Sequence, residues 1–180
     1  MVLREISKIK SFLPKESLNT LVTSLVLMRL DYCNALYYNI GANEINMLQS
    51  VQNSAIRLVF GQFKYDRKPF SHVFTDLHWL KIRERIIFKI CLVVHKCIWN
   101  LAPESLKSLI VISNTRTFLL VEPKFNSVYG ARAFSRAGPK LWNNLPLHVR
   151  MENDTTSFKK LLKSFLMIEH HAYYTRLNSR

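Results

Sequence analysis

Residues 78–103, HWLKIRERIIFKICLVVHKCIWNLAP, are the longest stretch of the chain with a clean helical period. Apolar side chains recur along it three or four residues apart, at Trp79, Ile82, Ile86, Ile90, Val93 and Cys97. Side chains at this spacing share one face of a helix. Pro103 ends the pattern, because the residue before a proline disfavours helical dihedrals. We therefore predict the longest helix of the chain within residues 79–100, with this apolar face in the core.

A stripe of positive charge accompanies the apolar face at the same kind of spacing, formed by Lys81, Arg85, Lys89 and Lys96. We expect these side chains to be exposed, and Arg83 to project elsewhere on the helix, beside Glu84. Such a row can contact a phosphate backbone, but an ordinary solvated helix face has the same pattern. For this helix taken alone the solvated face is the simpler interpretation, so a binding function needs support from the rest of the chain.

Composition supplies part of that support. The 180 residues include 26 Lys and Arg against 12 Asp and Glu, a formal charge of +14, and the pI is about 10.0. A surplus of this size indicates a polyanion partner, most often nucleic acid and less often an anionic membrane. It also fits a fragment whose acidic complement lies elsewhere. No uncharged run is longer than that of residues 17–28, which is too short to span a bilayer, so we expect no membrane association and an intracellular, nuclear and cytoplasmic protein.

Catalytic patterns are not found in the sequence. Two-metal chemistry needs closely placed carboxylates, whereas the acids here are dispersed and no Asp-Asp pair occurs. No P-loop, GxGxxG or nucleophile-elbow motif is present. Four of the six histidines (His72, His78, His95 and His148) are expected to cap, pack or lie at the surface, and the cysteines (Cys33, Cys91 and Cys97) to be small buried thiols. We predict no catalytic residue, no metal site, no cofactor and no small-molecule substrate, and therefore no enzyme activity of the chain alone.

The N-terminal third predicts three helices. Residues 2–12 form a short basic amphipathic pattern that Pro14 ends, and a second helix runs from Pro14 to Tyr38, apolar on most sides and so expected to be buried. A third is expected to be capped by Asn43 and closed by Gly61, with one side formed by Ile45, Leu48, Gln52, Ala55 and Val59. Residues 62–70 follow as a loop that interleaves aromatic rings with Lys64, Arg67 and Lys68. Such a loop can pair with phosphates and stack on bases, or it is a plain surface loop. A short helix is expected over residues 69–77.

Beyond Pro103 the chain is basic and aromatic. Residues 117–129 lack a helical period and are expected to form two short strands that turn near Glu122 and Pro123. A short helix near 136–144 is expected to bury Trp142, with Arg132, Arg136 and Lys140 exposed around it. A last helix, with Thr155 or Thr156 as its N-cap, places apolar side chains opposite lysines. Its apolar side is formed by Phe158, Leu161, Leu162, Phe165 and Leu166, and its basic side by Lys159, Lys160 and Lys163.

These elements predict a mainly α protein, an irregular helical bundle with a minor β-hairpin near 117–129. Only 4 Gly and 6 Pro leave little room for a turn-rich β fold. We divide the chain into an N-terminal helical segment (1–61), a basic loop with the central helix (62–112), a basic segment with the last helix (113–168) and a frayed tail (169–180).

Six segments in this order resemble the C-terminal region of reverse transcriptases from jockey-like and chicken-repeat-like non-LTR retrotransposons. They are LDYCNALYY, LQSVQNSAIRLVFG, DLHWLKIRERIIFKICLVVHK, NLAPESL, GARAFSRAGPKLWNNLP and SFKKLLKSFL. The resemblance covers roughly residues 17 to 167. It implies a chain that begins near or within the thumb, after the polymerase palm and an apurinic-type endonuclease. None of the family's catalytic motifs is in this sequence, so no catalytic residue is carried over.

Three positions depart from the family pattern. Lys81 and Ser105 stand where the family usually has Pro and Tyr, and His95 stands where it usually has Tyr. The first change is expected to lengthen the central helix slightly, and the second removes an aromatic anchor. These departures fit a decayed or truncated copy, in which Met1 is a start codon assigned inside an older reading frame.

The function that the resemblance implies is RNA or DNA binding during target-primed reverse transcription by the full enzyme, without catalysis by this segment. The expected partners are the RNA or DNA backbone and the upstream polymerase domains. The expected contacts are Lys64, Arg67, Lys68, Lys81, Arg85, Lys89, Arg132, Arg136 and Lys140. Two alternatives stay open: a helical protein–protein interaction module, whose apolar helix 14–38 seats a partner helix, and a decayed retroelement product without function.

Overall fold

A computed structural model describes residues 2–60, 74, 77–124 and 130–168. The mainly α fold with a minor β-hairpin is confirmed. The chain forms two compact units, and the boundary between them falls inside one helix. Unit 1 comprises residues 1–34 and 40–85, and unit 2 comprises residues 35–39 and 86–180. The loop at 62–70, most of the short helix expected at 69–77 and the tail from 169 lie outside the described residues.

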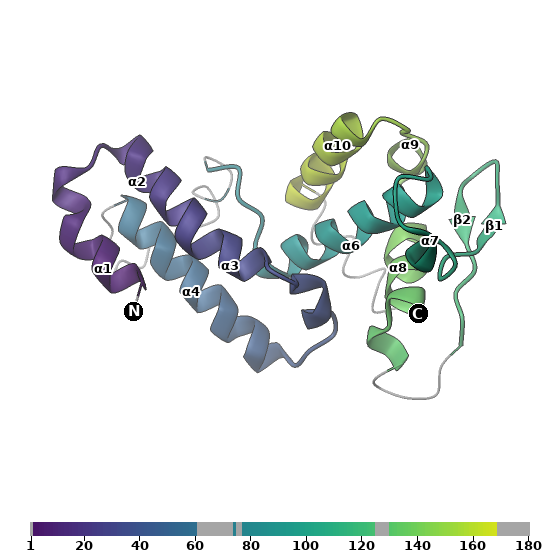
Figure 1. Cartoon of the computed structure of the whole chain (residues 1–180), viewed down its shortest axis with the longest axis horizontal. Coiled ribbons are helices and arrows are strands. Elements are labelled where there is room, and N and C mark those ends of the chain that lie inside the picture. Colours follow the sequence, from purple (N-terminus) through teal and green to yellow (C-terminus); the bar gives the residue numbers. More distant parts are fainter. Residues whose placement is uncertain (1, 61–73, 75–76, 125–129, 169–180) are drawn as a thin grey trace. The chain divides into compact units, whose positions relative to one another are not determined.

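Unit 1 is built from the helices labelled α1 to α4 in Figure 1, and these pack around one apolar cluster. Its elements are α1 (Val2–Ile9), the 3₁₀ turn η1 (Lys10–Phe12), α2 (Lys15–Val22), the π-helical turn η2 (Thr23–Leu27), α3 (Met28–Asp31) and α4 (Ala42–Phe60). The continuous run α2–η2–α3 lies beside α4, and α1 also contacts α4. The buried cluster contains Ile6, Leu18, Val22, Val26, Leu27, Ala55, Ile56, Val59, Phe74 and Trp79.

The second predicted helix is shorter than expected. It ends at Asp31, and Cys33 adopts a left-handed backbone with φ 50°, after which only the 3₁₀ turn η3 (Asn34–Tyr37) follows. Nor is this helix buried on most sides, because Met28 is 65% exposed and Tyr32, just beyond it, 77% exposed. Composition alone suggested burial, whereas only the side that faces α1 and α4 is covered.

Helix α4 is the longest described helix, with 19 residues, against 17 in α6 (Ile82–Ile98). The prediction that the longest helix lies within 79–100 is therefore wrong. The predicted core side of α4 is confirmed, with Ile45, Gln52, Ala55 and Val59 buried and Leu48 half-buried. Asn43 lies inside the helix, one residue after its start, so it is not the N-cap.

Helix α6 begins after Lys81 and is joined to α4 by two glutamines of unit 1. The Ile82 backbone N–H donates to Gln49 Oε1 at 3.0 Å, and Gln52 Nε2 donates to the Leu80 carbonyl at 2.8 Å. Since the first N–H groups of a helix have no partner within it, the Gln49 amide takes the place of a capping side chain.

Helix α6 ends at Ile98, several residues before Pro103. Asn100 has φ 57°, and the N–H groups of Leu101 and Asn100 donate back to the carbonyls of Lys96 and Cys97. This is a Schellman motif, in which a left-handed residue closes the helix. Asparagine can take the position that glycine usually occupies, because it tolerates the left-handed region.

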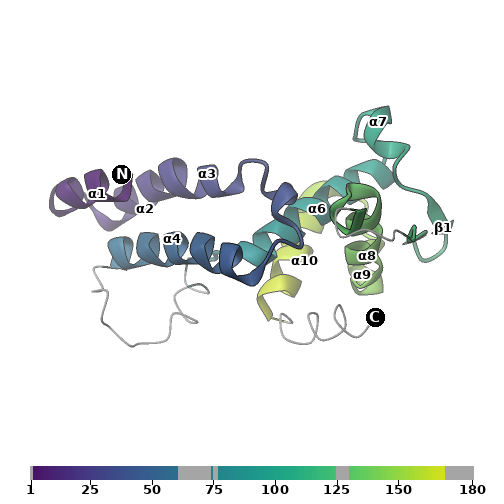
Figure 2. The ribbon, with the colours of Figure 1, turned by 90° about the horizontal axis from the view of Figure 1, so that it is seen from below.

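Unit 2 contains the remainder of α6 and the rest of the chain to Ile168 (Figure 2). Its further elements are α7 (Glu104–Lys107), β1 (Ile112–Asn114), β2 (Leu119–Leu120), η4 (Gly130–Arg132), α8 (Phe134–Asn143), α9 (Leu147–Arg150) and α10 (Thr155–Ile168). The two strands pair antiparallel with a register shift between Ile112 and Asn114. The hairpin therefore turns at 115–118, earlier in the chain than the predicted turn at Glu122 and Pro123, because the expected region missed β1 entirely.

Aromatic rings from several elements fill the core of unit 2. Trp142, predicted to be buried, is fully so, and its Nε1–H donates to the Phe118 carbonyl at 2.7 Å. Phe158 of α10 lies against Trp142 (ring centroids 5.7 Å) and is stacked on His95 of α6 (4.1 Å). The histidine that stands where the resembling family has tyrosine is thus a packing residue.

Helix α10 has the predicted two-sided character with one exception. Phe158, Leu162, Phe165 and Leu166 are buried, whereas Leu161 is 36% exposed. The N-cap is Asp154 rather than Thr155 or Thr156, because its Oδ2 accepts from the Ser157 N–H at 2.7 Å. That hydrogen bond also lowers the pKa of Asp154. Among the described helices none is long and apolar enough to cross a membrane.

Candidate nucleic-acid interface

Arg85, placed in the basic stripe of the central helix, is committed to a structural contact. Its Nε donates to Asp31 Oδ1 at 2.7 Å and its Nη2 to Asp31 Oδ2. The side chain is only 16% exposed, so the prediction that Arg85 is exposed is wrong. The reason is tertiary: the end of α3 brings a carboxylate onto the face of α6 that carries this guanidinium. The pair occupies the Nε–Nη2 edge of the guanidinium, one of the edges that would bind a phosphate in a bidentate way, and it offsets the positive charge.

The other members of the stripe are more open. Lys81 and Lys89 are exposed, as predicted, and Lys96 is half-buried. Lys81 Nζ lies 6.0 Å from the centroid of the Phe74 ring. Lys81 belongs to unit 1, whereas Lys89 and Lys96 belong to unit 2. The stripe is therefore divided between the two units, and Arg83 is exposed elsewhere on the helix.

Beside this stripe the buried arc of α6 is wider than one apolar face. Ile82, Ile86, Ile90 and Cys97 are buried as predicted, and so is Trp79. Val93 is only half-buried, while Val94 on the next side is fully buried. Cys91 and His95 are fully buried as well. Buried positions occupy more than half of the circumference of α6. Val93 therefore lies at the edge of the buried arc and not at its centre.

The second predicted group of bases lies in unit 2, on η4 and α8. Arg132, Arg136 and Lys140 are spaced four residues apart, which places them along one side of this segment, and all three are half-buried. Arg132 Nε is buried and has no hydrogen-bond partner among the described residues. The expectation that these bases are fully exposed to solvent is therefore wrong, because each side chain is partly covered by the unit.

Helix α10 contains a basic face that lies outside the predicted set of contact residues. Lys159 and Lys160 are exposed and Lys163 is half-buried, opposite the buried Phe158 side. No acidic residue occurs in residues 155–168. The signal that could have identified this site was this lack of acids, which leaves the lysines of α10 without neutralising neighbours on their own helix.

Charge is unequal between the units. Unit 2 contains 14 Lys and Arg against 5 Asp and Glu, and unit 1 contains 12 against 7. Most of the surplus therefore belongs to unit 2. Within it, the described helices α8 and α10 hold five bases and no acid. The predicted bases Lys64, Arg67 and Lys68 lie outside the described residues.

Not every base of unit 2 faces solvent. Arg150 is 9% exposed, its Nε donates to the Leu145 carbonyl at 3.1 Å, and its Nη1 donates to the Thr117 carbonyl at 2.6 Å. Burial lowers the pKa of this guanidinium, yet two carbonyl acceptors compensate part of the desolvation. Arg150 therefore joins α9 to the hairpin turn and is not a candidate for phosphate contact.

The buried titratable side chains of unit 2 have environments typical of packing residues and not of catalytic residues. His95 Nε2 donates to the Glu152 carbonyl at 3.0 Å, and burial lowers the pKa of its ring. Burial raises the pKa of the thiols of Cys91 and Cys97, which makes them poor nucleophiles. Cys33 is exposed, contrary to the expectation that all three cysteines are buried, and all three are free thiols.

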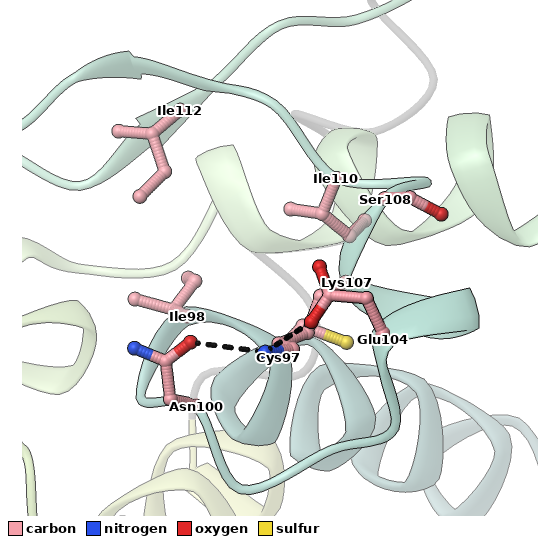
Figure 3. A pocket seen from close by; sticks show the side chains of 8 residues that line it. All are labelled: Cys97, Ile98, Asn100, Glu104, Lys107, Ser108, Ile110 and Ile112. Carbon is pink, nitrogen blue, oxygen red and sulfur yellow. Dashed lines mark hydrogen bonds and ion pairs between the residues drawn. The ribbon is translucent and has the colours of Figure 1, made fainter.

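A pocket of about 280 Å³ lies beside the end of α6 in unit 2 (Figure 3). It is lined by Cys97, Ile98, Asn100, Glu104, Lys107, Ser108, Ile110 and Ile112. Lys107 Nζ donates to Asn100 Oδ1 at 3.4 Å and pairs with Glu104. Figure 3 shows Ile98, Ile110 and Ile112 around one space, with Asn100, Lys107 and Glu104 along its lower side and Ser108 beside Ile110. None of the predicted contact residues lines it.

Comparison of the chain with protein-family models, with curated proteins and with solved structures finds no match.

Proposed function

We propose that the chain binds the phosphate backbone of RNA or DNA, mainly through unit 2, and performs no catalysis of its own. In this proposal it is a C-terminal segment of a non-LTR retrotransposon reverse transcriptase, where it contributes nucleic-acid binding to target-primed reverse transcription. The six segments that resemble this family support the second half of the proposal. The first half depends on charge and exposure and can be tested independently of it.

The observation that carries the proposal is the basic face of α10, a helix whose residues 155–168 include no acid. Lys159 and Lys160 are exposed on a helix whose opposite side is buried. Lysines without a nearby carboxylate keep their charge available to an external anion, and a phosphate that they neutralise releases condensed counterions. We assign Lys89, Arg132, Arg136, Lys140 and Lys163 to the same binding role in unit 2, and Lys81 in unit 1. Arg85 is left out of this set because of its pairing with Asp31.

The experiment is a salt series with a matched charge control. Binding of a labelled single-stranded RNA and of a duplex DNA is measured by fluorescence anisotropy for the wild type and for Lys159→Ala/Lys160→Ala. Each lost contact should reduce the slope of log affinity against log salt by about 0.7 for the single strand and about 0.9 for the duplex. Affinity should fall alike for unrelated sequences, because phosphate contacts carry no sequence information.

The control is Lys8→Ala/Lys107→Ala, which removes the same formal charge. Both lysines already have carboxylate partners, Glu5 and Glu104, so the slope should change much less. A salt response that is flat for the wild type, or equal losses in the two double variants, would show that the α10 lysines do not contact the nucleic acid.

A helical protein-interaction module is the second candidate function. It is favoured by apolar side chains exposed along the second helix of unit 1 and just beyond it, at Leu25, Met28, Tyr32 and Leu36. Leu36 belongs to unit 2 by contact, so the first three define the surface to test. An apolar interface responds weakly to salt, which distinguishes it from a phosphate contact in the same salt series.

A further inference from the structure

The two edges of the β-hairpin in unit 2 differ in how their backbone groups are satisfied. The Val121 N–H donates to the Val111 carbonyl at 2.9 Å, and Ile112 is paired with Leu120. In an antiparallel ladder this makes Ile112 and Leu120 a non-hydrogen-bonded pair. The N–H and C=O of both residues therefore point away from the hairpin, Leu120 on the side of β2 and Ile112 on the side of β1.

The edge of β2 is closed by a side chain. Asn143 Oδ1 accepts from the Leu120 N–H at 2.9 Å, and Asn143 Nδ2 donates to the Leu120 carbonyl at 2.9 Å. The carboxamide thus imitates one residue of a neighbouring strand. On the edge of β1, by contrast, the described part of the chain provides no hydrogen-bond partner for the backbone groups of Ile112.

The open edge adjoins an apolar surface. Val111 is 58% exposed and Ile112 40% exposed, and Leu109 shortly before them is 44% exposed. The pocket of about 280 Å³ opens beside the same strand, with Ile112 in its wall together with Ile98 and Ile110 (Figure 3). Open strand edges with exposed apolar side chains are templates for pairing with another chain, and such edges bind extended peptides by strand addition.

We infer that β1 is a docking edge for an extended apolar peptide of a partner protein, flanked by acidic residues. Its backbone pairs with the N–H and C=O of Ile112, and one aliphatic side chain enters the pocket between Ile98, Ile110 and Ile112. The acidic flanks follow from charge complementarity, since unit 2 has 14 bases against 5 acids. The two acids that border residues 105–121 are both engaged, Glu104 of the pocket wall by Lys107 and Glu122 by Asn143. This inference does not depend on the proposed nucleic-acid binding, because none of the residues that form the open edge and the pocket is assigned to phosphate contact.

The test uses the full chain and an array of octapeptides in which two Asp residues flank four central positions on each side. The central positions are drawn from Val, Ile, Leu and Phe, and the tightest binder is remeasured in solution. Ile112→Pro removes the outward N–H but no hairpin bond, and proline is tolerated at such edge positions. Ser108→Trp fills the pocket from its exposed rim, where the Ser108 hydroxyl bonds only the Ser105 carbonyl among the described groups. Leu147→Ala, at an exposed apolar position of α9, is the matched control.

We expect Ile112→Pro and Ser108→Trp each to weaken peptide binding about tenfold or more, the loss that one buried hydrogen bond or apolar anchor produces. Leu147→Ala should leave affinity unchanged, and circular dichroism should show the same helix content in all variants. A peptide N-methylated at successive backbone positions probes the same bonds from the other side, so the inference stays testable if Ile112→Pro unfolds. It is overturned if no member of the array binds, or if binding survives both N-methylation and Ile112→Pro. It is also overturned if sedimentation shows that β1 pairs two copies of this chain, with dimers lost in Ile112→Pro.

Discussion

Arg85 and Asp31 form a two-pronged ion pair that joins the first turn of α6 to the last turn of α3. The two residues lie 54 positions apart in the sequence but belong to the same unit. Asp31 also accepts from Asn34 Nδ2 at 3.3 Å. One carboxylate therefore holds both the start of the central helix and the turn after α3.

Asp31→Asn should destabilise unit 1. The neutral amide keeps the shape of the side chain but loses the charge-assisted bonds to Arg85, and because the pair is partly exposed the cost should be about 1–2 kcal/mol. Urea unfolding measures it. The control is Glu5→Gln, which breaks an exposed ion pair with Lys8 and should change the unfolding free energy by less than about 0.5 kcal/mol. Equal effects of the two substitutions would show that the Arg85 pair is no more than a surface contact.

Ile86 and Val93 provide a second comparison, within one helix. Ile86 is 3% exposed, and Ile86→Ala should lower the unfolding free energy by about 2–5 kcal/mol, because it leaves a cavity in a close-packed environment. Val93 was predicted on the same face but is half-buried, so Val93→Ala should cost distinctly less. Urea denaturation of the two variants measures both losses of unfolding free energy. A loss below about 0.5 kcal/mol for Ile86→Ala would contradict the placement of Ile86 in the core.

The periodicity of residues 78–103 was sufficient to predict α6, because an amphipathic helix records its buried face in the spacing of its side chains. The same periodicity could not predict which polar side chains of α6 are buried as well. Glu84 and His95 are covered because neighbouring elements extend the buried arc. Which elements pack against a helix is a tertiary property that no local spacing encodes.

The ends of elements were harder to predict than their interiors. Asn43, Thr155 and Pro103 are plausible boundary residues by type, yet α4 begins at Ala42, Asp154 caps α10 and a left-handed Asn100 ends α6. Several neighbouring residues could serve at each boundary, and the choice among them depends on small differences in backbone geometry. The hairpin was misplaced for a related reason, because β1 and β2 are too short to show alternation.

The candidate site was predictable as a tendency and not as a set of residues. Net charge and the lack of acids are additive properties of the sequence, and they remain the basis of the proposal. Whether a particular base is available is not additive: Arg85 is held by Asp31 and Arg150 by two backbone carbonyls. Nothing near either arginine in the sequence indicates these partners.

His95 should make unit 2 sensitive to mild acid. Burial lowers the pKa of its ring below the ordinary value, although the Glu152 carbonyl and the carboxylates of Glu152 and Asp154 oppose that change and Lys96 adds to it. The unfolded chain then binds a proton that the folded chain does not, so the stabilising contribution is complete above about pH 6.5 and is lost as the pH falls below it. The pH dependence of the urea midpoint should therefore be steeper for the wild type than for His95→Gln between about pH 7.5 and 5.5.

The exposed His148 provides the control for that experiment. His148→Gln makes the same replacement at an exposed position and should change the unfolding free energy at pH 7.5 by less than about 0.5 kcal/mol. The buried Glu84 also titrates, and its titration changes stability with pH in the opposite direction to that of His95. Because Glu84 is present in all the variants compared, its contribution cancels in the difference between them. If His95→Gln and the wild type lose stability in parallel, the His95 ring is protonated without cost in the folded state.

Burial should make the Glu84 carboxylate destabilising at neutral pH. It is 2% exposed, and burial raises the pKa of its carboxyl to about 6 from 4.5, although its own backbone N–H, Lys81 and Arg83 counteract part of that rise. A raised pKa means that its stabilising contribution is complete below about pH 4.5 and is lost as the pH rises through about 6. A difference of this size corresponds to about 2 kcal/mol. Glu84→Gln, which keeps the shape without the charge, should therefore raise the unfolding free energy by up to about that amount at pH 7.5 and by little near pH 4.5. The exposed Glu44→Gln should change it by less than about 0.5 kcal/mol at either pH. A loss of stability in Glu84→Gln at neutral pH would mean that the ionised carboxylate holds the start of α6 by interactions stronger than its desolvation.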